Sequence, residues 1–278
     1  MSRRMASLLR RILSPPPVVA VVPLAGLIAP RAGFGRMTLN VETVGPTLAR
    51  AFRARRLAEV ALIINSPGGS ATQSDLIAQR VRQHAAEEGV KVTAFVEDVA
   101  ASGGYWLACA ADEILCRETS ILGSIGVISA SFGFARLLGR IGVERRLYTA
   151  GERKSLLDPF LPAREEDIAR LKSVQADLHE RFKAWVRERR GGKLRGEEAL
   201  LFSGEVWTGA KAVALGLADG IGEVRSTMRA RHGEEVRFAV YGTGRRPWWT
   251  RLLPSPEGIV GAATAALEER AAYARFGL

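Results

Sequence analysis

Short apolar runs rich in β-branched residues alternate with helix-like segments along this chain, and this alternation limits the folds available to it. Strands separated by helices pair in parallel, because each crossover helix returns the chain to the same end of the sheet. The sequence therefore predicts an α/β fold, a mainly parallel sheet in repeated βα units covered by helices. The predicted strands are residues 18–22, 60–64, 92–96, 114–116 and 143–148.

Helical patterns fill most of the gaps between these runs. Residues 41–56 and 73–88 are predicted helices, and Ser70 and Thr72 are suitable N-cap residues for the second. The apolar residues expected to be buried in that second helix are Leu76, Ile77 and Val81. A long helix over residues 163–190, with apolar residues at spacings of three and four, is expected to cover the core. A short helix is predicted over residues 208–215.

The composition along the chain predicts one domain flanked by two tails. Three prolines at positions 15–17 separate a basic amphipathic segment, residues 1–17, from a predicted domain over residues 18–241. Residues 242–278 differ in composition and are predicted to form a tail with a helix-prone end. The apolar stretch at residues 18–29 is about 12 residues long, whereas a membrane-spanning helix needs roughly 20. It is therefore interpreted as the first buried strand.

The formal net charge of +11 makes nucleic acid and anionic membranes candidate partners. The excess cations are spread along the chain without interleaved aromatic residues, so nucleic-acid binding is not expected. The arginine-rich helix predicted at residues 2–13 is either a solvated N-terminal helix or a weak anchor on an anionic membrane. The Trp248–Trp249 pair is interpreted as an oligomer contact, as a cap packed on the domain or as a peripheral contact with a membrane surface. Such contact would place the chain on the cytoplasmic face of the membrane.

The cysteine content is low. Cys109 and Cys116 are too few for a disulfide framework or a tetrahedral zinc site. The sequence therefore favours a reducing compartment, the cytoplasm, and predicts no metal site and no cofactor.

Two glycine-rich turns follow predicted strands, at residues 65–69 and 100–104. Glycine lets the backbone turn sharply and leaves amide groups free to hold an oxyanion, although a plain strand-to-helix turn has the same pattern. Ser102 in the second turn is interpreted either as a helix cap or as a nucleophile. Because the carboxyl ends of adjacent parallel strands meet at one edge of a sheet, both turns are expected to lie close together.

Lys154 follows Ser102 in the chain and lies in the segment at residues 151–155. A lysine acts as a base near neutral pH only when burial or nearby cations lower its pKa, and Arg153 and Leu156 could supply both conditions. The alternative is an ordinary solvated lysine. Together, Ser102 and Lys154 suggest a serine peptidase with a Ser-Lys dyad.

Five ordered motifs resemble the bacterial signal peptide peptidase A family over roughly residues 18–240. They are residues 64–69 (INSPGG), 101–105 (ASGGY), 123–127 (GSIGV), 151–155 (GERKS) and 204–222 (GEVWTGAKAVALGLADGIG). The resemblance implies a Clp-protease/crotonase-type fold and hydrolysis of peptide bonds.

The same resemblance assigns roles to individual residues. It implies that Ser102 is the nucleophile, that Lys154 is the general base and that Gly69 and Gly103 donate to the oxyanion. Ser155 is expected to help orient the lysine. Family members assemble into rings that enclose their sites, so a homo-oligomer is expected, with the dyad completed within one subunit or across an interface. Family members commonly carry an N-terminal membrane span, and none is recognised in this sequence.

The predicted function is therefore a serine endopeptidase that cleaves unstructured or membrane-derived peptides, of the signal-peptide-remnant type, through an acyl-enzyme. One alternative is an acyl-CoA enzyme of the crotonase group, which shares the fold and the oxyanion amides. Another is a catalytically silent scaffold at a membrane surface.

Overall fold

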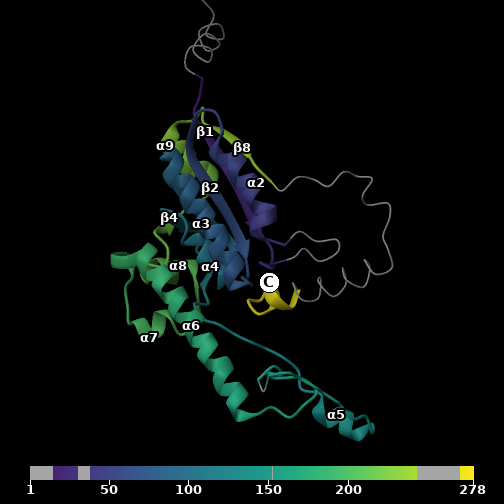
Figure 1. The fold of residues 1–278 in the computed structure, drawn as a ribbon. Helices are drawn as coiled ribbons and strands as arrows, with labels where there is room; N and C mark the ends of the chain where they lie inside the picture. Colours follow the sequence, from purple (N-terminus) through teal and green to yellow (C-terminus); the bar gives the residue numbers. More distant parts are fainter. Residues whose placement is uncertain (1–14, 31–37, 152, 243–269) are drawn as a thin grey trace, which may run out of the picture.

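One sheet organises the computed structural model, which describes residues 15–30, 38–151, 153–242 and 270–278 (Figure 1). In this part of the chain the sheet has eight strands: six follow the order β6-β5-β3-β2-β1-β8, while β4 pairs with β3 and with β7. Only the β5–β6 pair is antiparallel. The strands are β1 (Val18–Ala25), β2 (Leu57–Ser66), β3 (Val92–Ala101), β4 (Glu113–Cys116), β5 (Ile121–Gly123), β6 (Val206–Thr208), β7 (Gly220–Ile221) and β8 (Arg237–Val240). The predicted α/β class is confirmed.

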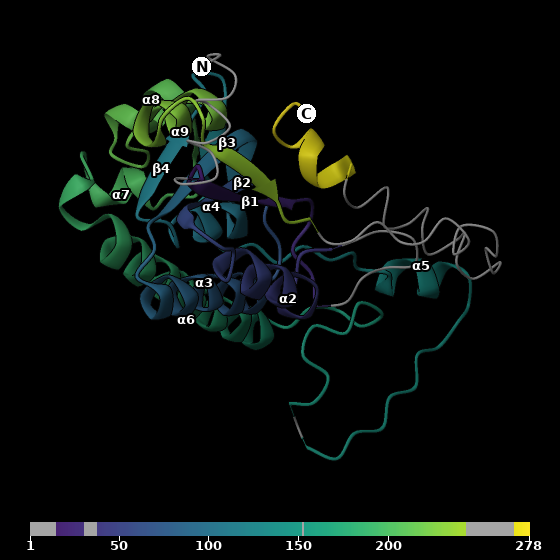
Figure 2. The same cartoon turned by 90° about the horizontal axis from the view of Figure 1, so that it is seen from above.

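Helices connect these strands and cover both faces of the sheet. They are α2 (Val41–Phe52), α3 (Ala71–Glu88), α4 (Gly103–Ala108), α5 (Ala135–Arg140), α6 (Glu165–Arg190), α7 (Glu198–Leu201), α8 (Gly209–Ala214) and α9 (Val224–His232), with a 3-10 turn at Gly191–Lys193. Figure 2 shows α2 and α3 on one side of the strands and α9 on the other.

The alternation of side chains along β1 explains this two-sided cover. Ala20 and Val22 join the larger core under α2 and α3, whereas Val19 and Val21 join a smaller cluster with Met228 of α9. Because successive side chains of a strand point to opposite faces, a strand apolar at every position must be covered on both sides.

Local capping fixes where two of the predicted helices begin and end. The side chain of Asn40 accepts a hydrogen bond from the amide of Thr43, and the amide of Asn40 donates one to the side-chain oxygen of Thr43, so α2 begins with a capping box. Ser70 caps α3 through the amide of Gln73, and the chain leaves α3 at Gly89 in the left-handed conformation. Ser70, rather than Thr72, is the N-cap residue.

The strand β3 pairs with two different strands along its length. Its first half, residues 93–96, pairs with β4, and its last three residues, 99–101, pair with β5. The carboxyl end of β3 is therefore held between β5 and the end of β2. This is the place where the predicted nucleophile leaves the sheet.

Three sequence predictions are wrong in this part of the chain. Residues 143–148 form no strand, and Val143, Leu147 and Tyr148 are exposed. Leu76 is exposed rather than buried, although Ile77 and Val81 are buried as expected. The helix α6 does not cover the core along its whole length, since its apolar residues are buried only in the second half.

Residues 128–163, which we call the arm, connect the segment that follows β5 to α6. Among the arm residues that the structure describes, none is buried, and α5 lies well away from the sheet (Figure 1). Large apolar side chains are exposed along the arm; they are Ile128, Phe132, Phe134, Leu137, Ile141, Val143, Leu147, Tyr148, Leu156 and Phe160. The arm therefore carries apolar surface that its own chain does not cover.

Two predictions for the tails fall outside the described residues. The basic helix at residues 2–13 and the Trp248–Trp249 pair both lie there, so the boundaries 1–17, 18–241 and 242–278 stay predictions. Of the helix-prone end, residues 270–274 are described and form one helical turn.

Candidate active site

Ser102 occupies the sharp turn between β3 and α4. Its φ of 52° and ψ of −120° lie where residues other than glycine are rarely found, so the backbone is strained there. Its hydroxyl makes no capping hydrogen bond to α4, which argues against the interpretation of Ser102 as a simple helix cap. The residue is half-buried and lines a cavity of about 740 Å³.

The turn that follows β2 packs directly against Ser102. A Cβ on Gly68 would lie 2.8 Å from the Cβ of Ser102 and 2.8 Å from the amide nitrogen of Gly103, and the φ of Gly68 is +102°. Only glycine fits both the space and the backbone conformation. The two glycine turns therefore meet at the carboxyl ends of the paired strands β2 and β3, as the sequence predicts.

The backbone amides of Gly69 and Gly103 lie beside the turn that contains Ser102. Both residues line the cavity, and a Cβ on Gly103 would lie 3.3 Å from the amide nitrogen of Gly69. Neither amide has a hydrogen-bond partner among the residues that the structure describes. Two free amide groups next to a serine are the components from which an oxyanion hole is built.

A third turn, after β5, forms another wall of the cavity and was given no role from the sequence. Ser124 has a φ of 52°, and its amide donates a 2.6 Å hydrogen bond to the carbonyl oxygen of Glu205. Gly123 precedes it with a φ of +114°, and a Cβ there would lie 2.7 Å from the ring of Trp207. The Gly-Ser-Ile-Gly spacing was the sequence signal for this turn.

Helix α6 supplies an apolar wall. Leu178, His179 and Phe182 line the cavity, and the Phe182 ring stacks on that of Trp106 with 4.8 Å between the centroids. The Nε2–H group of His179 donates to the carbonyl oxygen of Ile125 at 3.0 Å, which joins α6 to the turn after β5. Sequence analysis missed His179 because its partner lies 54 positions away in the chain.

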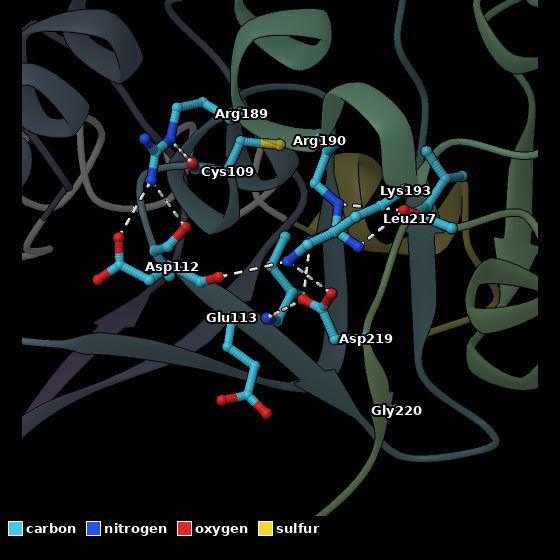
Figure 3. Close-up of polar contacts among 12 residues, drawn as sticks. Cys109, Asp112, Glu113, Arg189, Arg190, Lys193, Leu217, Asp219 and Gly220 are labelled. Carbon is cyan, nitrogen blue, oxygen red and sulfur yellow. Dashed lines mark hydrogen bonds and ion pairs between the residues drawn. The ribbon is translucent and has the colours of Figure 1, made fainter.

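A network of ion pairs holds the end of α6 in place (Figure 3). The guanidinium of Arg190 is almost completely buried, contacts a carboxylate oxygen of Asp219 at 2.7 Å and donates two hydrogen bonds to the carbonyl oxygen of Gly216. Lys193 contacts the other carboxylate oxygen of Asp219 at 2.8 Å. Arg189 donates to the carbonyl oxygen of Cys109, just after α4. The network therefore fixes α6 against the helix that follows Ser102.

The pKa values in this network follow from burial and from these contacts. Burial opposes the charged form of Asp219, but hydrogen bonds from Arg190, Lys193 and the amide of Ile114 outweigh it and hold the pKa of Asp219 below its ordinary value. Burial raises the pKa of the Cys109 thiol to about 12 and that of Cys116 to about 11. Both cysteines are free and buried, so neither is a nucleophile at neutral pH.

Lys154 is not brought to Ser102 within the single chain. It lies in the arm, is exposed, and is not among the residues that line the cavity. Ser155, the predicted orienting residue, lies in the same turn of the arm. The structure thus brings together Gly69, Ser102 and Gly103 and leaves the predicted base on a separate, exposed segment.

Comparison with known proteins identifies one family model that matches the chain. The model described as Peptidase family S49 matches residues 84–236, which is more than half of the chain and includes Ser102, Gly103 and Lys154. A chloroplastic serine protease, SPPA, from Arabidopsis thaliana is 33% identical over 175 residues, which cover 62% of this chain and 25% of that protein. A protein named "Probable protease SohB" from Haemophilus influenzae is 33% identical over 163 residues, 59% of this chain and 45% of that protein.

A further relative has an unrelated name. A Brucella abortus protein named Na(+)/H(+) antiporter NhaA is 46% identical over 273 residues, which cover 94% of this chain and 37% of that protein. This chain therefore spans little more than a third of that relative, and its aligned part includes nearly all of the region that the family model matches. Among the described residues, no helix combines the length and apolar character that crossing a membrane requires.

Proposed function

Because the chain belongs to peptidase family S49, we propose that it is a serine endopeptidase with Ser102 as nucleophile and Lys154 as general base. The Ser102 turn is the observation that carries this proposal. It presents a strained serine with an uncommitted hydroxyl beside the free amides of Gly69 and Gly103, on the wall of a cavity. Acyl transfer to a serine requires a nucleophilic hydroxyl, amide groups that donate to the oxyanion, and space for the substrate.

In the proposed mechanism, the Ser102 hydroxyl attacks the carbonyl carbon of the scissile peptide bond while the neutral Lys154 amine takes its proton. The negative charge that develops on the carbonyl oxygen is stabilised by the amides of Gly69 and Gly103. The C–N bond then breaks, and the lysine ammonium gives its proton to the leaving amine. Water then attacks the acyl-enzyme and gives a proton to the same amine, and the lysine ammonium returns that proton to the Ser102 oxygen as the ester C–O bond breaks, which releases the peptide acid and the free hydroxyl.

We propose that the base comes from a second copy of the chain. Lys154 lies in the exposed arm, and of the arm residues that the structure describes only Ile128, at the start of the arm, lines the cavity. The arm also carries a row of exposed apolar side chains, a surface of the kind that contacts between protein subunits cover. We therefore assign the dyad to an interface in a closed homo-oligomer, where the arm of one subunit reaches the cavity of its neighbour.

The cavity supports unstructured, apolar peptides as the substrate class. Its walls include Leu27, Trp106, Val127, Ile128 and Phe182, and peptide segments left in or near membranes are rich in matching side chains.

A subunit-mixing experiment tests the interface dyad. Ser102→Ala and Lys154→Ala should each abolish hydrolysis of a fluorogenic peptide. When the two inactive variants are mixed and allowed to exchange subunits, about one quarter of the sites combine an intact serine with an intact lysine, if assortment is random. Activity should return to about that fraction of the unmodified level. Lys172→Ala, which changes an exposed lysine of α6, serves as the matched control and should leave turnover unaltered.

The outcomes separate the parts of the proposal. A mixture that stays inactive would place the dyad within one subunit, and an active Lys154→Ala variant would remove Lys154 as the base. Failure of a fluorophosphonate probe to label Ser102 would remove the peptidase assignment itself.

The acyl-CoA alternative receives less support from the same cavity. Hydration or hydrolysis in crotonase-type sites depends on acidic residues, and no Asp or Glu is among the described residues that line this cavity. Incubation with an acyl-CoA should therefore give no product.

A further inference from the structure

Residues 270–278, which are far from Ser102 in the sequence, lie against the cavity that contains Ser102. Residues 270–274 form one helical turn, and Ala272, Arg275 and Phe276 line the same cavity as Ser102. Both views show the segment, in yellow, next to the sheet domain and apart from α5 (Figures 1 and 2). The sequence analysis gave this segment no role in the site.

One face of the segment is turned towards the domain. Ala272, Tyr273 and Phe276 are half-buried, whereas Ala271 and Ala274 are exposed. Spacings of one and four residues place the three half-buried side chains on one side of a helical turn. The segment therefore packs on the domain through a defined face.

A hydrogen bond anchors this face beside the proposed oxyanion hole. The Tyr273 hydroxyl donates to the carbonyl oxygen of Asn65 at 2.7 Å. Asn65 lies near the end of β2, directly before the turn that contains Gly68 and Gly69. That carbonyl oxygen also accepts a hydrogen bond from the amide of Gly26, so the anchor point is itself fixed by the sheet.

We infer that residues 270–278 are a tethered peptide ligand of the cavity, which a substrate has to displace. Ala272 and Phe276 add apolar surface to a cavity with both apolar and polar walls, and Arg275 adds a cation at its wall. The cavity thus accepts a short helical peptide with an aromatic side chain and a neighbouring arginine. The competition between the segment and a substrate rests on the proposed function. The binding of the segment to the cavity does not depend on that function.

The tether makes the segment an efficient competitor. A ligand that is joined to its site by the same chain binds at a high effective concentration, so it competes more strongly than the same free peptide would with identical contacts. A free peptide then binds only to the fraction of molecules in which the segment has left, so its apparent affinity falls by that fraction. The segment should therefore raise the KM for a peptide substrate while leaving kcat unchanged.

Kinetics on three variants test the effect on substrate. A chain that ends at residue 269 should show a KM for a fluorogenic peptide that is lower by about 5–10-fold. Tyr273→Phe, which removes only the anchoring hydroxyl, should lower KM by about 2–5-fold. Ala271→Ser changes an exposed position of the same turn and should leave both constants unaltered.

A binding measurement tests the ligand independently of catalysis. A fluorescent peptide with the sequence of residues 270–278 is titrated into chains that carry Ser102→Ala, and anisotropy is recorded. The chain that ends at 269 should bind the peptide about 5–10-fold more tightly than the full chain, whose own segment lines the cavity and competes with the peptide. Equal affinity for both chains, or no binding to either, would overturn the inference. Absence of hydrolysis in all variants would instead contradict the proposed function and leave the anisotropy result valid.

Discussion

The backbone amide of Ser102 donates a 2.8 Å hydrogen bond to the carbonyl oxygen of Gly123. This bond continues the pairing of β3 with β5 by one residue into the turn, so the sheet itself holds Ser102 in its strained conformation. Ser124, the residue after Gly123, also has a positive φ and lines the same cavity. Backbone strain is therefore concentrated around the proposed nucleophile, which is typical of functional sites.

Replacing Ser102 should separate strain from catalysis. Glycine adopts the observed φ and ψ without steric cost, whereas alanine keeps the strain. Ser102→Gly and Ser102→Ala should both be inactive, but the glycine variant should be more stable than the alanine variant by about 1 kcal/mol in urea unfolding. Equal stability of the two variants would show that the turn is not strained.

Gly68 should tolerate no side chain. Gly68→Ala would force a Cβ to within 2.8 Å of Ser102 in a backbone conformation that alanine disfavours, so we expect a loss of at least about 2 kcal/mol in the free energy of unfolding, and of activity. Gly45→Ala in α2 is the matched control. No atom lies within 4 Å of the new Cβ there, and alanine should stabilise the helix by about 0.5–1 kcal/mol. A stable, active Gly68→Ala variant would contradict the described packing.

Both thiols should be unreactive in the folded protein. Because burial raises the pKa of Cys109 to about 12 and that of Cys116 to about 11, almost no thiolate is present at pH 8. Iodoacetamide should modify neither cysteine in the native chain under conditions that label both after unfolding in urea. Mass spectrometry of the intact protein reads out the result, and rapid native labelling of Cys109 would show that the end of α4 is open to solvent.

Asp219 should contribute stability that depends on pH. Its pKa is held below 3.8 in the folded chain, so the contribution is present above the pKa of the unfolded state and is lost as the pH falls through the folded value. Asp219→Asn should therefore cost about 2–3 kcal/mol at pH 7, with the difference from the unmodified chain shrinking below about pH 4.

The control for this experiment is a solvent-exposed ion pair. Glu234 lies 3.8 Å from Arg229 at the surface, and Glu234→Gln should change the stability by less than about 0.5 kcal/mol at either pH. If Asp219→Asn behaves like Glu234→Gln, the network in Figure 3 does not hold α6.

The longest buried strands were predictable because their sequences admit few alternatives. Residues 18–22 and 60–64 are continuous apolar runs in β1 and β2, residues 92–96 of β3 are interrupted only by Thr93, and such runs need cover on both faces. Strands β5 to β8 have two to four residues each, so their pairing depends on neighbours distant in the chain rather than on a local pattern. Residues 143–148 carry a strand-like pattern but lie in the arm, where none of the described strands pairs with them.

The site was predictable to the extent that it follows from strand order. Gly69, Ser102 and Gly103 converge because β2 and β3 are neighbours, and the alternation of strands and helices already implied that. Ser124, His179 and Phe276 could not be placed, since they reach the cavity through contacts between segments far apart in the sequence. The approach of Lys154 to Ser102 stays a prediction that the subunit-mixing experiment tests.

None of the arm residues that the structure describes has its side chain buried in the interior of its own chain. Substitutions between residues 128 and 163 therefore remove little packing from the sheet domain. They should change the melting temperature of an isolated subunit only slightly. Evolution can consequently reshape how copies recognise one another in this region while the fold of each copy is left intact.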